Sequence, residues 1–342
     1  MSIKRLLSML KLCRAHDSKG EAVFVKKFLA PYAPEVFHDI AGVPLAYGVT
    51  VAGCENSHGS DVLWCAHVDT VHPKDAPLYQ TIIYDTECQL IFKDDKDPLK
   101  MPLGADNAAG CWMLMEMIDA GVPGTYLFHR GEERGGIGSA AMAKNFPDFL
   151  RQFKYAIAFD RRGTCDVITQ MMVGRTCSDV FAQSLGDKIN ARDNSLSYSP
   201  DNTGSFTDTA NYIRLIPECT NVSVGYDFEH GPSEMLDVAH LVALRDAVVG
   251  AFKEGTGDLP VVRGVNDVEE YAKYSWGNWK DKNYGADDAD AEFCLDPRDS
   301  TDIANMGYKE IVKWVRLSAP EDVADLLQTL ADELEFGKQV FN

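Results

Sequence analysis

Four short apolar runs, each followed by polar residues, constrain the fold of this chain more than any other feature of its sequence. They are "DVLWCAHV" (61–68), "TYLFHR" (125–130), "YAIAFD" (155–160) and "NVSVGY" (221–226). Such runs are typical of strands buried on both faces of a parallel sheet. Segments with helical periodicity (107–121, 139–153 and 233–255) and a candidate hairpin (81–92) separate them. This alternation predicts an α/β fold, a three-layer α/β/α sandwich with a central mixed, mostly parallel sheet.

The character of the sequence changes near residue 256. Residues 1–255 hold all of the segments named above and are predicted to form one domain. Residues 256–342 begin with an aromatic and then acidic stretch of little periodicity, and they end in two more helical segments. We expect 256–342 to be a C-terminal extension docked on the first domain. At the N-terminus, Lys11 interrupts the apolar residues and no small-residue cleavage site follows, which favours an amphipathic helix over a signal peptide.

Acidic and imidazole side chains lie at the carboxyl ends of the apolar runs and in the loops between them. Because the carboxyl ends of parallel strands meet at one edge of a sheet, we expect these side chains to converge there. The set consists of His67, Asp69, Asp106, Glu132, Glu133, Asp160 and His230.

Taken singly, each of these residues has an ordinary structural role. A histidine at a strand end is usually hydrogen-bonded, an aspartate before a helix such as Asp106 is usually an N-cap, and paired glutamates usually face water. Seven such groups at successive strand and loop ends are hard to explain as independent. A divalent metal relieves their repulsion, and imidazole with carboxylate is a ligand set for zinc, with cobalt or manganese as possible substitutes.

Five motifs carry a resemblance to a known family. In order, "HVDTV" (67–71), "GADNAAG" (104–110), "GEERGGIGS" (131–139), a strand-end aspartate and "EHGPSE" (229–234) resemble the motifs of the co-catalytic di-zinc exopeptidases. The resemblance covers about residues 15–254. It implies a zinc exopeptidase-like domain with two Zn²⁺ ions per chain and a cis peptide after the bridging aspartate, between residues 106 and 107.

The resemblance also assigns roles to single residues. His67 and Asp160 would bind one metal, Glu133 and His230 would bind the other, and Asp106 would bridge both. The carboxylate of Asp69 would receive the outer N–H of His67 and fix its tautomer. Glu132 would be the general base, with its side chain opposite to that of Glu133 at a strand end.

The spacing of the motifs separates the branches of this family. His67 and Asp106 are 39 positions apart, and Asp160 and His230 are 70 apart. Neither interval has room for the extra domain that other branches insert there, so the chain resembles the compact aminopeptidase branch. An aspartate at position 160 also goes with aminopeptidases in this family. The resulting prediction is a zinc metallo-aminopeptidase that hydrolyses N-terminal peptide bonds with a metal-bridged hydroxide and Glu132 as base.

Four further residues have two interpretations each. Arg161 and Arg162 follow a predicted ligand directly, and are either surface charge or contacts to a substrate carboxylate. Asp208, in "GSFTDTANY", either hydrogen-bonds His230 or caps a helix. Glu234 is expected to cap or steady the helix that follows His230.

Several alternatives to an aminopeptidase stay open. The same superfamily includes amidohydrolases that remove acyl groups, carboxypeptidases, and glutaminyl-cyclase-like enzymes with a single zinc. A non-catalytic binding protein on the same scaffold is a rival of another class, although the complete ligand set argues against it. A nucleotide site is disfavoured, because "GEERGGIG" has neither the spacing nor the lysine of a phosphate loop.

Composition limits the partners. The net charge of −19 argues against nucleic acid, which requires a basic face. No apolar run approaches the roughly 18 residues of a membrane span. Nine cysteines without a C-x-x-C pair are typical of reduced thiols, so we expect a cytoplasmic protein. We expect a peptide or aminoacyl small molecule as the substrate, and a monomer is slightly favoured.

Overall fold

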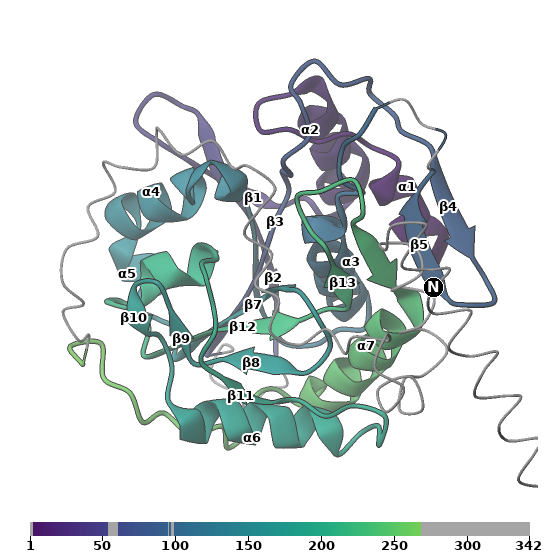
Figure 1. The fold of residues 1–342 in the computed structure, drawn as a ribbon. Coiled ribbons are helices and arrows are strands. Elements are labelled where there is room, and N and C mark those ends of the chain that lie inside the picture. The colour runs from purple at the N-terminus through teal and green to yellow at the C-terminus, as the bar shows by residue number, and fades with distance from the viewer. Residues whose placement is uncertain (1–2, 54–60, 95, 97–98, 268–342) are drawn as a thin grey trace, which may run out of the picture. The chain divides into compact units, whose positions relative to one another are not determined.

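The predicted central sheet is present in the computed structural model of the chain, which describes residues 3–53, 61–94, 96 and 99–267 (Figure 1). Its strand order is β1-β2-β6-β3-β7-β12-β8-β11. The strands are β1 (Glu35–His38), β2 (Pro44–Val51), β3 (Val62–His67), β6 (Gly124–His129), β7 (Tyr155–Arg161), β8 (Asp166–Ile168), β11 (Ser199–Asp201) and β12 (Glu218–Ser223).

The central strands β6, β3, β7 and β12 are mutually parallel, and they are the four apolar runs of the sequence. Strands β1 and β2 are antiparallel to their neighbours, as is β8 to β12. The sheet is therefore mixed and mostly parallel, as predicted. The strand expected at 221–226 begins earlier, at Glu218, because polar residues at its start hide a segment that is buried throughout.

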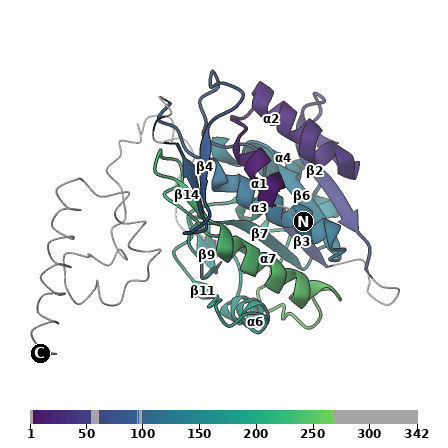
Figure 2. The same ribbon diagram turned by 90° about the vertical axis from the view of Figure 1, so that its right-hand side faces the viewer.

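Helices cover both faces of this sheet (Figures 1 and 2). One apolar core contains residues of α1 (Ile3–Leu10), α3 (Ala105–Asp119), α6 (Asp179–Asn190) and α7 (Val238–Phe252), and the other contains residues of α4 (Ile137–Asn145) and α5 (Pro147–Leu150). Strand β3 supplies Trp64 to the first core and Leu63 and Cys65 to the second. This alternation is the period of two that a buried strand imposes.

Two helix predictions have different outcomes. The segment 139–153 is broken before Pro147, as expected, because proline begins a new helix more readily than it continues one. The segment 233–255 is not one helix. Its first part is strand β14 (Met235–Asp237), and α7 begins at Val238 with the Asp237 side chain as its N-cap.

Smaller elements lie around this framework. The predicted hairpin is β4 (Ile82–Asp85) and β5 (Leu90–Lys93), which joins β13 (Tyr226–Asp227) and β14 in a second sheet. Shorter pieces are α2 (Lys19–Phe24), the π-helix η1 (Val25–Leu29), the 3-10 helices η2 (Ala30–Tyr32), η3 (Glu132–Arg134) and η4 (Asp208–Tyr212), and the pair β9 (Gln170–Met171) and β10 (Gly174–Arg175). The turn between β13 and β14 carries His230.

The start of the predicted extension contacts the domain before it. The carboxylate of Glu218 accepts the backbone N–H groups of Val262 and Arg263, and the Arg263 guanidinium donates to the carbonyl of Ile213. The compact unit to which these residues belong ends at Tyr271. The rest of 256–342 lies outside the described residues, so its docking stays a prediction.

Two further observations concern the described residues alone. None of their helices is long and apolar enough to cross a membrane. No disulfide joins any of their seven cysteines.

Candidate metal centre and active site

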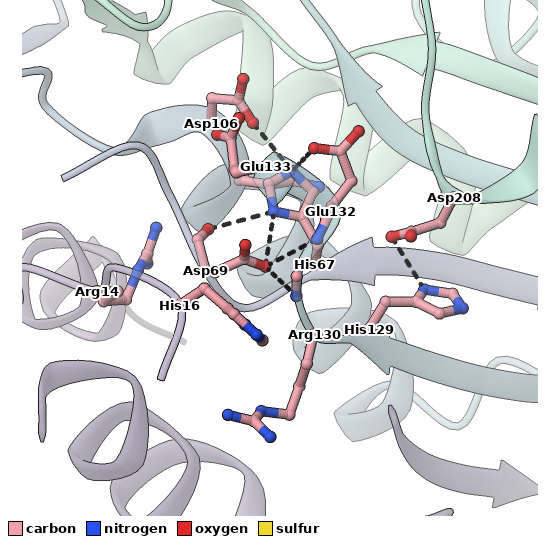
Figure 3. A network of polar contacts seen from close by, with 12 residues as sticks. Arg14, His16, His67, Asp69, Asp106, His129, Arg130, Glu132, Glu133 and Asp208 are labelled. Atoms are coloured by element: carbon pink, nitrogen blue, oxygen red, sulfur yellow. Dashed lines mark hydrogen bonds and ion pairs between the residues drawn. The ribbon is translucent and has the colours of Figure 1, made fainter. Parts of the chain in front are cut away.

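The structure brings the seven predicted side chains together beyond the carboxyl ends of β3, β6 and β7. Figure 3 shows His67, Asp69, Asp106, Glu132 and Glu133 of this set. His67 ends β3, Asp160 lies near the end of β7, and the two glutamates follow β6 in η3. Asp106 lies in the first turn of α3, and the peptide bond that follows it is cis, as the resemblance implied.

Asp106 lies between two groups of candidate metal ligands. Its Oδ1 is 3.0 Å from Nε2 of His67, which is also 3.1 Å from Oδ1 of Asp160. Its Oδ2 is 3.2 Å from Nε2 of His230, which is also 3.2 Å from Oε2 of Glu133. Within each group the potential ligand atoms lie within 4.8 Å of one another. One carboxylate therefore serves both groups, with one oxygen turned to each.

The chemistry of these donors fits a pair of divalent cations. Each group has one imidazole and two carboxylates, which is a donor set for zinc. Glu133 Oε1 is buried and has no hydrogen-bond partner among the described residues, as expected of an oxygen available to a cation. The carboxylate of Asp106 does not cap α3, so the alternative role as an N-cap is wrong; the side chain of Asn107 accepts the N–H of Gly110 instead.

Burial and mutual repulsion shift the acids upward. Burial, reinforced by the charge of Asp106, raises the pKa of Glu133 to about 7 and that of Asp160 to about 6. Burial also raises the pKa of Glu132 well above its ordinary value, helped by the charges of Asp160 and Glu133. Burial has the same effect on Asp106, but hydrogen bonds from His230 and His67 outweigh it, so the pKa of Asp106 is lowered. The site therefore has a strong electrostatic demand for cations.

The orientation of His67 differs in one detail from the expectation. Its Nδ1 lies 3.2 Å from the backbone carbonyl of Asp69 and 3.7 Å from the Asp69 carboxylate. The carboxylate accepts the backbone N–H groups of Gly131, at 2.9 Å, and Glu132, at 3.3 Å. Residue 69 still favours a proton on Nδ1 and leaves Nε2 free as a ligand. Its carboxylate, however, fixes the turn that carries the glutamates.

The two glutamates do not alternate along a strand as predicted, because they lie in the 3-10 turn η3. Gly131 precedes this turn with a φ of 72°, a left-handed conformation that a residue with a side chain rarely adopts. The turn directs Glu133 to His230, while Oε2 of Glu132 lies 3.8 Å from Nε2 of His67. Neighbouring residues thus face different groups, although by a geometry other than the one expected.

Two residues that the sequence did not single out fix Asp160. The side-chain amide of Asn221 pairs with its backbone, accepting the N–H of Asp160 and donating to its carbonyl, both at 2.9 Å. The hydroxyl of Thr207 donates to Oδ2 of Asp160 at 2.7 Å. Both residues belong to stretches that the sequence analysis quoted, but their partners lie 61 and 47 positions away, and neither separation follows from a local pattern.

The predicted substrate contacts are placed unequally. The Arg161 guanidinium donates to Asp166 at 3.0 Å and to Thr203 at 2.9 Å, so it is committed to structural partners. The Arg162 side chain is 47% exposed and approaches Glu229, the residue before His230, at 3.7 Å. Arg162 is therefore the more available of the two to a ligand.

Asp208 and Glu234 have partners other than those expected. Asp208 lies 3.3 Å from Nδ1 of His129 rather than beside His230, because η4 directs it to the end of β6 (Figure 3). Glu234 does not cap α7. Its carboxylate accepts the backbone N–H groups of Gly104 and Asp106.

A further acidic group with a histidine lies nearby, formed by His16, Asp17 and Glu21. The Arg130 guanidinium occupies it, donating to both oxygens of Glu21 at 3.0 and 2.7 Å and to Asp17 at 2.8 Å. This group is therefore an ion-pair network, which ties α2 to the end of β6.

Comparisons with known proteins place this geometry in a known fold. No protein-family model and no curated protein matches the chain. Among solved structures, aminopeptidase PepT from Bacillus cereus ATCC 10987 is similar, with a TM-score of 0.54 and 16% identity over 74% of this chain and 99% of that one. A tripeptidase from Staphylococcus aureus has a TM-score of 0.55 and 16% identity over 73% and 96% of the two chains.

A third similar structure is the TET1 peptidase of Pyrococcus horikoshii, which can assemble into a tetrahedron or a large octahedral shell. Its TM-score is 0.50, with 14% identity over 72% of this chain and 98% of that one. At such identities the likeness concerns the fold, and it confirms at that level the resemblance found in the motifs. The chain has the α/β fold of these peptidase structures.

Proposed function

We propose that the protein is a metal-dependent peptidase, and more specifically an aminopeptidase with two zinc ions per chain. The observation that carries the proposal is the position of Asp106, whose two oxygens face two separate groups of imidazole and carboxylate ligands. His67 and Asp160 would hold one ion, Glu133 and His230 the other, and Asp106 both. When bound, the ions would supply an acidified water and polarise the scissile carbonyl.

Glu132 is the proposed proton carrier. It is buried and lies beside the first group, and burial raises its pKa well above the usual value, which makes its carboxylate a stronger proton acceptor than that of an exposed glutamate. In a peptidase it would take the proton of the attacking water and return it to the leaving amine. Asp69 supports this role indirectly, because it holds the backbone N–H of Glu132.

The aminopeptidase assignment has two supports. Similar structures are named as an aminopeptidase and a tripeptidase. In addition, a carboxylate-rich site attracts a free N-terminal ammonium group. Arg162, half exposed beside the turn that carries His230, is a candidate for the carboxylate of a short peptide. The alternatives are a deacylase, a carboxypeptidase, a non-catalytic scaffold and a single-zinc cyclase. The position of Asp106 between two ligand groups argues against the cyclase.

The proposal is tested by metal analysis of the purified chain, together with a panel of aminoacyl amides, blocked peptides and N-acyl amino acids. We expect two zinc ions per chain, loss of activity with a strong chelator and recovery with zinc or cobalt. Cleavage should require a free amino terminus. Glu132→Gln should retain both ions and lose about 10²–10⁴-fold in turnover. Hydrolysis by the metal-free chain, or full activity of Glu132→Gln, would contradict the proposal.

The oligomeric state and location are separate matters. The monomer favoured by the sequence stays a prediction, which light scattering of the purified chain would test. A cytoplasmic location likewise stays a prediction.

A further inference from the structure

The loop that leads into Asp106 is held by a carboxylate that the metal groups do not use. Glu234 Oε2 accepts the backbone N–H of Gly104 at 2.8 Å, and Oε1 accepts that of Asp106 at 2.9 Å. The side chain is buried, with 1% of its surface exposed. Hydrogen bonds from backbone N–H groups to a carboxylate are about twice as strong as neutral ones. Both oxygens of Glu234 are thus committed to one short stretch of backbone.

Other buried side chains hold the carbonyl groups of the same loop. The Arg14 guanidinium donates to the carbonyl of Gly104 at 2.9 Å and has no exposed surface. His72 Nε2 pairs with the carbonyl of Pro102 at 2.9 Å, and Gln80 donates to that of Leu103 at 2.7 Å. The backbone from residue 102 to residue 106 is therefore positioned by groups from separate parts of the sequence.

Glu234 differs from these other groups because it also belongs to the turn of a metal ligand. His230 lies four positions earlier in the same turn, its side chain is 54% exposed, and its φ is 65°. Glu234 therefore connects His230 and Asp106, two of the candidate metal ligands of the second group. In the first group, by contrast, Asn221 and Thr207 fix Asp160 independently of this turn.

We propose that Glu234 is a positioning residue for the second metal ion, which it serves by holding Asp106 and the turn of His230 in register. The inference rests on the proposed function, since it requires that two ions bind. It leads to an unequal effect. Loss of the Glu234 carboxylate should weaken the binding of the second ion, held by His230 and Glu133, far more than the binding of the first.

The experiment is a zinc titration of the metal-free full-length chain against a competing chromophoric chelator, with thermal unfolding measured on the same samples. Glu234→Gln keeps the shape of the side chain but removes one acceptor and the charge. His230→Ala identifies which binding step belongs to the second group. The expected result for Glu234→Gln is a second step weakened by about 10–100-fold, the usual effect of removing a group that orients metal ligands, and a first step changed by less than about threefold.

Glu218→Gln is the matched control. Glu218 has no exposed surface and also accepts backbone N–H groups, from Ser178 and Val262, both at 2.7 Å. It begins β12, at the end of the sheet opposite to the metal ligands. We expect Glu218→Gln to lower stability and leave both zinc steps unchanged. This comparison separates positioning of a ligand from a general loss of structure.

The outcomes distinguish the inference from the function on which it rests. A wild-type chain that binds fewer than two zinc ions overturns the proposed function, and the inference with it. If the wild type binds two ions and both zinc-binding steps are unchanged in Glu234→Gln, the inference alone is overturned. The same holds if Glu218→Gln weakens the second zinc-binding step as much as Glu234→Gln does. If Glu234→Gln does not fold, Glu234→Asp keeps the charge but cannot span both N–H groups; an unchanged second step in that variant refutes the inference equally.

Discussion

The Arg130–Glu21 ion pair allows a quantitative prediction about stability. Glu21 is 2% exposed and receives two hydrogen bonds from the Arg130 guanidinium, which also donates to the carbonyl of Pro44 at 3.0 Å. Glu21→Gln preserves the shape of the side chain but leaves a buried cation without its main partner. Removing one member of a buried pair costs about 3–5 kcal/mol. Asp17, half exposed at 2.8 Å, still offsets part of this charge, so we expect about 3 kcal/mol.

The assay is urea unfolding of the full chain at a fixed zinc concentration, followed by the fluorescence of tryptophans, of which Trp64 and Trp112 are fully buried. In a thermal melt of the same samples, a loss of about 3 kcal/mol should lower Tm by about 6–12 °C for a unit of this size. The matched control is Asp148→Asn, which breaks the exposed pair with Arg151, whose two side chains are 94% and 58% exposed. We expect the control to change stability by less than about 0.5 kcal/mol.

A double variant tests the cause. Replacing both partners, Glu21→Leu with Arg130→Met, removes the buried charges together, and should recover much of the stability that Glu21→Gln loses. If Glu21→Gln lowers the free energy of unfolding no more than Asp148→Asn does, the Arg130–Glu21 pair contributes no more than a surface pair, and the reasoning from burial is wrong. If the double variant is no more stable than Glu21→Gln, the loss comes from packing and not from an uncompensated charge.

Three further predictions concern packing, protons and metal. A Cβ on Gly110 would lie 2.0 Å from the carbonyl oxygen of Phe159, so Gly110→Ala should lower the free energy of unfolding by about 1–3 kcal/mol or more and reduce metal binding. In the control Gly250→Ala, the nearest atom to the new Cβ is 3.7 Å away, so this substitution should be neutral or stabilising. Burial lowers the pKa of His72 to about 3, so the unfolded chain binds one more proton than the folded chain, and stability falls as the pH drops below about 6.5. His72→Asn removes this proton, so the free energy of unfolding should depend less on pH in this range, by about 1.4 kcal/mol per pH unit. The pKa of Glu133 is raised to about 7, so the metal-free folded chain binds one more proton than the unfolded chain and loses stability as the pH rises from about 4.5 to 7. The gain in Tm on adding zinc should therefore be larger at pH 7 than at pH 5.

The sequence was sufficient to predict the sheet and the identity of the converging groups, because both depend on local patterns. An apolar run followed by His67 or Asp160 locates the end of a buried strand, and the ends of parallel strands share one edge. The order of the motifs then supplied the resemblance. These features require no knowledge of how distant side chains pack.

The sequence was insufficient wherever a side chain bonds the backbone of a distant segment. The sequence predicts that Glu234 caps or steadies the following helix, but its partners are 130 and 128 positions away, at the start of α3 and in the loop before it. The sequence predicts the residues of β14 as the start of that helix, because they are apolar and fit both periods, and their pairing with β5 is not visible locally. Asp69 was assigned to His67, whereas its carboxylate holds the turn of Glu132.

The balance of charge at the site argues for two ions rather than one. The five carboxylates predicted to converge are all largely buried, and in neutral form the two imidazoles add no charge. Buried charges of like sign are tolerated only when they are compensated. Two divalent cations would reduce a formal charge of −5 to −1. A single ion would leave −3. The buried guanidinium groups of Arg14 and Arg130 do not offset this charge, because Arg14 donates to the Gly104 carbonyl and Arg130 donates to Glu21 and Asp17. The same accounting supports the proposal of two ions over the single-zinc alternative.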